Sequence, residues 1–350
     1  MKKIIYSIIL LLFIPLIMNA DSFTSLWKQV DVAKEKDLPQ SEIKILKIIA
    51  NKAEAEGSYG NLLAAEFYQA KLQTCISRDS MDSEIAKLEI KEQKAEEHNA
   101  VLAAVYQAAL AKIYRDRPYS TRNEGRLFNT KSDEYLKKAL SNPSLLASVK
   151  DAAYTPFVKI GTDSKLFYND LLHVIGLENS EYKILHDYYV NNGNRHAACI
   201  CACLMMQHDD DLIMEFDKKS KKSKYLQKID SLINEYNDLP EAGELAIEHY
   251  STISEQDDAK PEDLINYISY ALNHWGAWPR MNILRNAQMR LTIPSFQVSL
   301  DDCILPDKPN EVRILSALNI NNLTMNVYRI NVNGDTQLHL DNSADYNKLK

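Results

Sequence analysis

Apolar residues recur every three or four positions over most of the chain between residues 22 and 290. The first stripe, formed by Phe23, Leu26, Trp27, Val30 and Ala33, predicts an amphipathic helix. Similar stripes follow, and residues 79–114 are interpreted as one long helical segment. The breaks between stripes are short and rich in proline, glycine and asparagine: 37–39, 57–60, 142–143, 155–156, 191–193 and 239–240.

Short breaks between helices favour antiparallel neighbours, and many such pairs in series make an α-solenoid. The first two stripes are typical of a tetratricopeptide-like helix pair, although the strict consensus of about 34 residues is not found. We therefore predict a mostly α chain, with a helical repeat domain over residues 21–290. The scarcity of glycine, with 9 in the chain, agrees with helices rather than a turn-rich all-β fold.

The pattern changes after residue 291, where apolar and polar residues begin to alternate. Residues 292–300, 312–318 and 323–332 each predict a strand, and Asn333-Gly334 is a strong hairpin signal. A β-sandwich needs roughly 100 residues and about seven strands. Residues 291–350 are therefore interpreted as an incomplete antiparallel β-sandwich segment of three or four strands.

The N-terminus has the order of a secretory signal peptide. Lys2 and Lys3 precede the apolar residues 4–17, and Met18-Asn19-Ala20 ends on a small residue where a signal peptidase would cut. An uncleaved anchor is the alternative, but the apolar run is shorter than the ~20 residues of a membrane span. We expect residues 1–20 to be removed, the protein to reach the periplasm or cell envelope, and membrane contact to occur only during export.

Charge changes the list of expected partners. Removal of residues 1–20 takes away two lysines and leaves 39 basic and 48 acidic side chains, a net charge of −9. Nucleic acid is an unfavourable partner for such a chain, because its binding depends on Lys and Arg neutralising phosphates. The single basic run, residues 218–224, is interpreted as a solvated helix start.

Five cysteines are candidate ligands or disulfide partners: Cys75, Cys199, Cys201, Cys203 and Cys303. Three of them lie in one helical pattern, where Cys199 and Cys203 share a face. Zinc sites usually combine two separated ligand pairs, and there is no second pair here. We interpret the three as small buried hydrophobes. A disulfide from Cys75 to one of them stays open, and the odd total leaves at least one thiol unpaired.

Other polar motifs do not add up to a catalytic site. Residues 208–211, His-Asp-Asp-Asp, lack the alternate spacing of a calcium loop and are interpreted as an acidic helix start. His173, His186, His196 and His249 each stand alone in a helical pattern. Phosphate-binding glycine loops and zinc-protease motifs are missing from the sequence. We expect no enzyme activity, no cofactor and no metal.

The sequence around residues 274–280, HWGAWPR, is the most unusual in the chain. One interpretation makes Trp275, Trp278 and Arg280 a ligand pocket with aromatic walls. The favoured interpretation makes the two indoles a plug at the junction between the helices and the strands. These three residues are our candidate domain-junction or binding site.

Four stretches carry a family resemblance. They are SFTSLWKQVDVAKEKDLPQSEIKIL (residues 22–46), AVLAAVYQAALAKIY (100–114), HWGAWPRMNILRNAQMRLTIPSFQV (274–298) and LPDKPNEVRILSALNINNLTMNVYRIN (305–331). They look like the N-terminal part of large bacterial alpha-2-macroglobulin-like proteins of the Bacteroides type. In that variant a helical region precedes the first macroglobulin domain. The resemblance covers nearly all of the chain after residue 21, and the last two stretches are its most specific parts.

The resemblance implies a link to endopeptidase inhibition. Family members are strings of β-sandwich macroglobulin domains that trap proteases after a bait segment is cut, often with a Cys-Gly-Glu-Gln thioester. This sequence has neither that motif nor a bait region, so no cysteine is carried over as the thioester nucleophile. The expectation is a truncated or fragmentary member, whose partners would be proteases through the parent protein, or other envelope proteins.

Two functions remain from this reasoning. The first is an N-terminal module of an alpha-2-macroglobulin-like inhibitor, itself structural and protein-binding. The alternative is a free-standing exported helical-repeat scaffold that binds a protein or peptide. A third idea, an enzyme that uses the Trp275 and Trp278 region as a pocket, would need an acid, base or nucleophile beside the indoles, and the sequence shows none.

Overall fold

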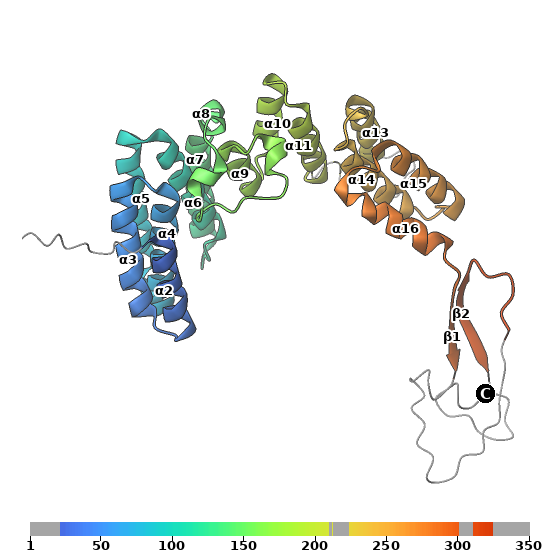
Figure 1. Cartoon of the computed structure of the whole chain (residues 1–350), viewed down its shortest axis with the longest axis horizontal. Helices are drawn as coiled ribbons and strands as arrows, with labels where there is room; N and C mark the ends of the chain where they lie inside the picture. Colours follow the sequence, from blue (N-terminus) through green and yellow to red (C-terminus); the bar gives the residue numbers. More distant parts are fainter. Residues whose placement is uncertain (1–21, 210–211, 213–223, 301–310, 325–350) are drawn as a thin grey trace, which may run out of the picture.

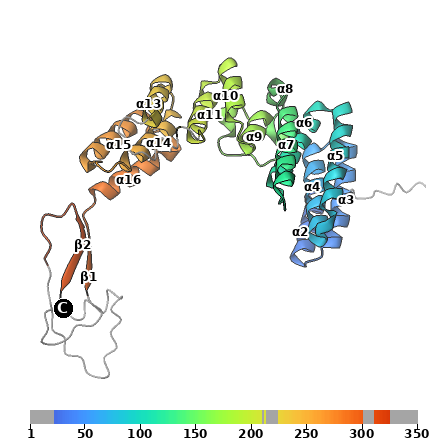
Figure 2. The ribbon, with the colours of Figure 1, turned by 180° about the vertical axis from the view of Figure 1, so that it is seen from behind.

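The structure is a computed structural model, and it describes residues 22–209, 212, 224–300 and 311–324. In these residues it is mostly helical and ends in a small two-stranded antiparallel sheet, which confirms the predicted fold class. Figure 1 shows the helices following one another along an arch, with the strands projecting beyond the last helix. The view from behind shows the same order (Figure 2).

The helices are α2 (Phe23–Glu35), α3 (Pro39–Glu56), α4 (Tyr59–Ile76), α5 (Met81–His98), α6 (Ala100–Asp116), α7 (Arg122–Ala139), α8 (Pro143–Ala147), α9 (Leu171–Glu178), α10 (Tyr182–Asn191), α11 (Arg195–Gln207), α13 (Lys224–Tyr236), α14 (Ala242–Ser254), α15 (Pro261–Trp275) and α16 (Asn282–Thr292). Single turns of 3-10 helix are η1 (Arg78–Ser80), η2 (Asp151–Tyr154), η3 (Ser164–Phe167) and η4 (Pro279–Met281). The strands are β1 (Ser295–Leu300) and β2 (Val312–Leu318).

Local sequence explains where many helices begin. Pro39 and Pro143 stand at the first turns of α3 and α8, where a missing N–H costs nothing. Thr121 and Glu124 form a reciprocal capping box at the start of α7. Gly57 ends α3 in the left-handed conformation, with φ of 66°, which a residue without a Cβ adopts at little cost.

The structure corrects the predicted long helix over residues 79–114. Two helices, α5 and α6, replace it, and Asn99 separates them with an extended backbone. The Asn99 side chain accepts a hydrogen bond from the N–H of Leu102 at 3.0 Å and so caps α6. Apolar periodicity continues across this break because both helices present apolar faces to the same core. The asparagine was the only sequence signal for the boundary.

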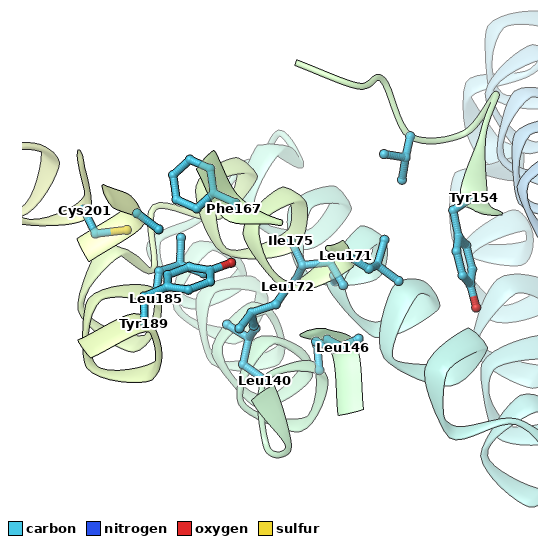
Figure 3. Close-up of a cluster of buried hydrophobic side chains, with 14 of the residues drawn as sticks. Leu140, Leu146, Tyr154, Phe167, Leu171, Leu172, Ile175, Leu185, Tyr189 and Cys201 are labelled. Carbon is cyan, nitrogen blue, oxygen red and sulfur yellow. The ribbon is translucent and has the colours of Figure 1, made fainter. Parts of the chain in front are cut away.

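Sequential helices pack on one another, as a solenoid requires. Contacts join α2 to α3, α3 to α4, α5 to α6, α6 to α7, α10 to α11 and α13 to α14. Their apolar faces merge into one continuous core of leucine, isoleucine, alanine and tyrosine. Figure 3 shows part of this core, where Leu146 lies below Leu171 and Leu172, and Leu185 and Tyr189 lie together farther along the array. Each helix pair therefore buries its apolar face on the next pair along the chain.

Buried or half-buried carboxylates accept hydrogen bonds from tyrosines of other helices, and these bonds tie the array together. The pairs that join two helices within the described residues are Tyr68 with Glu42, Tyr106 with Glu66, Tyr114 and Tyr135 with Glu89, and Tyr225 with Glu248. A buried carboxylate is costly unless its oxygens are bonded, so each tyrosine offsets part of the cost of burying its partner. These pairs account for several of the 19 tyrosines in the chain.

The two strands agree with the alternation predicted for residues 292–300 and 312–318. Phe296 pairs with Ala317 and Val298 with Ile314, so one face of the hairpin is apolar, and Leu315 is the extra residue of a bulge. Phe296 is 55% exposed and Ile314 59%. Most of the predicted strand over residues 323–332, and the Asn333-Gly334 turn, lie outside the described residues.

Candidate protein-binding groove

Trp275, Trp278 and Arg280 lie together inside the last helical unit. The indole of Trp275 donates a hydrogen bond to the carbonyl of Asn237 at 3.0 Å, and that of Trp278 donates to Glu244 at 2.6 Å. Arg280 pairs with the other oxygen of Glu244 at 2.7 Å. Both indoles are buried, and they bond to α14 and the α13–α14 connection rather than to β1. Their observed contacts are therefore structural, and a further role of these three residues at the domain junction or in binding stays a prediction.

The described cysteines are free thiols. The disulfide considered between Cys75 and one of the other three is therefore not formed. Cys199, Cys201 and Cys203 are buried, as predicted, and burial raises the pKa of each thiol, to about 12 for the latter two. Cys75, at the end of α4, is exposed. It is therefore the accessible thiol among these four, and Cys303 lies outside the described residues.

The four histidines singled out in the sequence lie next to single carboxylates. His173 faces Asp170 at 3.2 Å, His196 faces Glu241 at 2.9 Å, His249 faces Asp230 at 3.2 Å and His186 faces Asp187 at 3.6 Å. In the part of the chain that the structure describes, no group of three acidic, histidine or cysteine side chains is arranged to hold a metal. Asp210 and Asp211 of the His-Asp-Asp-Asp motif fall outside it.

A hollow of about 520 Å³ opens between α4, α5 and the C-terminal half of α6. Its apolar lining residues are Phe67, Ala70, Met81, Ile85, Leu88, Ile113 and Pro118. Cys75 lies on its rim, one helical turn beyond Lys71. A hollow of this size takes several side chains of a ligand, and its mainly apolar lining is typical of binding sites.

A second hollow, of about 310 Å³, adjoins the first along α6. Its apolar lining residues are Val105, Ala108, Ala109, Phe157, Val158, Val174 and Ile175. Lys112 borders both hollows, and the rings of Phe67 and Phe157, one from each, meet with centroids 5.2 Å apart. We call the two together the α6 groove. From Val105 to Arg117 it follows about 18 Å of helix at 1.5 Å per residue.

The connection after η2 forms one wall of the α6 groove. It approaches the start of α4 so closely that a Cβ on Gly60 would collide with the carbonyl of Thr155. Glycine at this position therefore permits the close approach of the two backbones. Tyr59 stacks near Tyr154 at 6.3 Å between centroids, which adds a second contact beside the glycine. The wall is thus fixed to the start of α4 at Tyr154 and Thr155.

Charges surround the apolar lining of the α6 groove. Lys112 pairs with Glu178 at 2.6 Å, and Arg117 pairs with Asp82 while lying over the ring of Phe128. Glu84 pairs with Lys87 at 2.5 Å. Three rim residues have no ion-pair partner within the described residues: Lys71, Asp116 and Lys159. The side chains of all three are exposed to solvent.

A separate hollow of about 650 Å³ lies between α5, α6, α7 and α8 and is more polar. At its edge Gln107 donates hydrogen bonds to Glu92 at 2.6 Å and to Glu96 at 2.8 Å, which holds the two carboxyl groups together. Burial raises the pKa of Glu92; Gln107 opposes the rise and Glu96 adds to it. Lys138 lies 3.5 Å from Glu96. We assign this hollow a structural role, because its polar groups bond to one another.

Sequence reasoning did not find the α6 groove. Its lining comes from α4, α5, α6, the connection after η2 and α9, which span residues 67 to 179. The lining residues that lie on helices belong to ordinary amphipathic stripes, so no local pattern distinguishes them from core. One local feature of the sequence could have indicated the groove: Phe157-Val158 is an apolar pair in a break that otherwise looks like a surface loop.

No family model matches the chain, and neither the curated proteins nor the solved structures contain a match to it. These comparisons do not link it to alpha-2-macroglobulin-like proteins, so that assignment stays a prediction. None of the helices in the described ranges combines the length and the apolar character needed to cross a membrane. The predicted signal segment, residues 1–20, lies outside those ranges.

Proposed function

We propose that this chain is an exported helical-repeat scaffold that binds an apolar segment of another protein in the α6 groove. The observation that carries the proposal is the joining of two apolar hollows along one helix, with their shared wall fixed by Phe67 and Phe157. Solenoid folds use such extended surfaces to bind protein segments. The groove is large enough for several side chains and therefore suits a peptide better than a small metabolite.

The groove also favours binding over catalysis. Apolar residues dominate both hollows, and the charged residues around them are mostly exposed, apart from Glu84, which is buried and paired with Lys87. Cys75 is a nucleophile by residue type, yet no histidine lines either hollow among the residues that surround them. The groove therefore offers apolar contact and exclusion of water rather than a set of reacting groups.

A selection experiment tests this proposal. Random peptides displayed on phage are selected on the purified protein, and the selected sequences are then measured against two variants. Ile113→Asp places a charge in the groove lining, whereas Ile90→Asp places the same charge on α5 at a side chain that is 53% exposed. The proposal expects binding to be lost in Ile113→Asp and kept in Ile90→Asp. Equal binding to both variants contradicts it.

A second candidate function comes from the family resemblance, namely the N-terminal module of an alpha-2-macroglobulin-like protease inhibitor. The apolar face of the β1–β2 hairpin supports it, because Phe296, Val298 and Ile314 are exposed there. Two strands alone are marginal in water and need a further partner for that face. A larger β domain would supply one.

The mass of the native polypeptide tests this second candidate. Cell-envelope extracts are blotted with an antibody raised against residues 22–290. A band several times larger than the 40.0 kDa of this sequence supports the inhibitor module. A band at or slightly below 40.0 kDa contradicts it and leaves the scaffold as the better account.

A further inference from the structure

The two hollows of the α6 groove follow one another on a single face of α6. Four residues of that helix have the spacing i, i+4, i+7 and i+11, which places them on one face: Val105, Ala109, Lys112 and Asp116. The first two line the second hollow, Asp116 lines the first hollow, and Lys112 lines both. The α6 residues of the two hollows are centred about six positions apart, which is roughly 9 Å along the helix.

A ridge formed by Phe67, Phe157 and Lys112 separates the two hollows. Phe67 lines the first hollow and Phe157 the second, and their rings meet with centroids 5.2 Å apart. Lys112 borders both hollows and pairs with Glu178 at 2.6 Å, and these two side chains are 50% and 62% exposed. A ligand that fills both hollows therefore has its apolar groups in two separate places. The part between them crosses a solvent-exposed ion pair and is favoured when it is polar.

The two hollows differ in size and in the character of their linings. The first, of about 520 Å³, is lined by Phe67 and by Met81, whose flexible thioether makes favourable contacts with aromatic rings. The second, of about 310 Å³, is lined by Val105, Val174 and Ile175, whose β-branched side chains are stiff. The first hollow therefore suits an aromatic side chain, and the second suits a smaller aliphatic one.

The unpaired charges also differ between the hollows. Lys71 and Asp116 border the first hollow, so both signs of charge are present there. Lys159 borders the second hollow, where the exposed carboxylate of Glu178 already pairs with Lys112. The second hollow therefore has an unpaired positive charge at its edge within the part of the chain that the structure describes. An acidic residue beside the aliphatic side chain of a ligand complements it.

We propose that the α6 groove recognises a segment of a partner protein by two unequal apolar side chains, which we call its anchors. An aromatic anchor enters the first hollow and an aliphatic anchor enters the second, with a polar residue between them and an acidic residue next to the aliphatic anchor. Consecutive Cα atoms are 3.8 Å apart, so anchors roughly 9 Å apart are not neighbours in the ligand sequence. This inference rests on the proposed function and adds what the bound segment must contain.

Two variants that fill one hollow each test the assignment of the anchors. Ala70 lines the first hollow and Ala109 the second, and both are half-buried residues of helices. The affinity of the full chain for a selected peptide, and for versions with each residue replaced by alanine in turn, is measured by calorimetry. On the wild type, loss of either anchor should weaken binding roughly tenfold or more.

The two filled hollows should then give opposite patterns. Loss of the aromatic anchor should have little further effect on Ala70→Phe, whereas loss of the aliphatic anchor should still weaken binding to that variant. Ala109→Phe should show the reverse. Circular dichroism checks that both variants are folded, and Ala70→Leu with Ala109→Leu replaces the pair where phenylalanine disturbs the fold.

The two unpaired lysines provide a matched test of the charge preference. A selected peptide that carries an acidic residue beside its aliphatic anchor should bind Lys159→Gln about two- to fivefold more weakly than the wild type. The same peptide with that acid changed to its amide should bind both proteins equally. Lys71→Gln, at the first hollow, should leave the preference for the acid over the amide unchanged.

The outcomes separate this inference from the function beneath it. A single important apolar position in the peptide, or anchors that respond alike to both filled hollows, overturns recognition by two anchors and leaves segment binding intact. An acid preference that is as strong in Lys159→Gln as in the wild type overturns the charge pattern. Selection of no peptide at all, or binding that survives Ile113→Asp as well as Ile90→Asp, overturns the proposed function and this inference with it.

Discussion

The ring of Phe157 packs against the ring of Phe67 with their centroids 5.2 Å apart, and this contact joins the connection after η2 to α4. Phe67 in turn lies 5.9 Å from Tyr106 on α6. Three segments that are far apart in sequence therefore meet at one aromatic cluster. The cluster lies where the two hollows of the α6 groove adjoin, so the stability of this region and the shape of the groove depend on the same side chains.

Replacement of Phe157 by alanine should therefore lower stability and open the groove wall. We expect a loss of about 2 kcal/mol in the free energy of unfolding, because the ring is partly rather than fully buried. Urea unfolding followed by circular dichroism measures it. Ile160→Ala is the matched control, since Ile160 is 51% exposed and should change stability little. Equal effects of the two substitutions would show that Phe157 does not hold the wall.

The bond between Tyr106 and Glu66 should contribute measurably to stability. Tyr106→Phe removes the hydroxyl and leaves the buried carboxylate of Glu66 with Lys91 alone. A loss of about 1–3 kcal/mol is expected, because a buried acceptor then lacks a donor. Tyr119→Phe is the control, since Tyr119 is 62% exposed. A midpoint of urea unfolding that does not move in Tyr106→Phe would contradict the proposed role of these pairs.

Glu92 should destabilise the fold at neutral pH. Burial raises its pKa in the folded state, so the folded protein binds a proton at Glu92 more tightly than the unfolded chain does. That contribution to stability is present below the ordinary pKa of a glutamate and is lost as pH rises through the raised value. Glu92→Gln should therefore gain stability over the wild type as pH rises from 4 to 7, while its amide oxygen still accepts from Gln107.

The free energies of unfolding of Glu92→Gln and of the wild type, measured at several pH values, test the direction of this pH dependence. Glu97→Gln, on the same helix with its side chain 72% exposed, should follow the wild type at every pH. A constant difference between Glu92→Gln and the wild type would mean that the carboxyl group does not titrate differently in the two states.

His249 should give the opposite pH dependence. Burial lowers the pKa of its imidazole, although Asp230 opposes the shift, and the ring stacks on Tyr267 with centroids 4.4 Å apart. The unfolded chain then gains a proton first as pH falls through about 6.5, so stability falls in that range. His249→Phe keeps the stacking and should flatten this dependence, as measured by thermal unfolding between pH 7 and 5. A slope equal to that of the wild type would contradict the assignment.

Much of the fold could be predicted from apolar periodicity and break residues. Pro39, Gly57 and Pro143 mark helix boundaries in the sequence because each restricts or permits particular backbone angles. The boundary at Asn99 was missed, since both flanking helices bury alanine-rich faces in the same core and the stripe runs through it. The strands β1 and β2 were predicted because alternation is visible without knowledge of their partner.

The candidate site could not be predicted in the same way. Trp275 and Trp278 attracted attention because their residue type and spacing are rare, and both proved to be buried and bonded within the last helical unit. The α6 groove consists of common residues such as Ile113 and Val105, which look like core in the sequence. Only the three-dimensional packing shows which apolar side chains remain open to a partner.

The rate of alkylation of Cys75 by iodoacetamide, with and without a selected peptide, tests the central claim most directly. Cys75 lies on the rim of the first hollow and is exposed in the free protein, and Cys303→Ser removes the other candidate thiol. Occupation of the α6 groove should slow the reaction in proportion to the fraction of protein bound, reaching near-complete protection at saturation. A rate that stays unchanged at saturating peptide would place the binding site elsewhere and contradict the account.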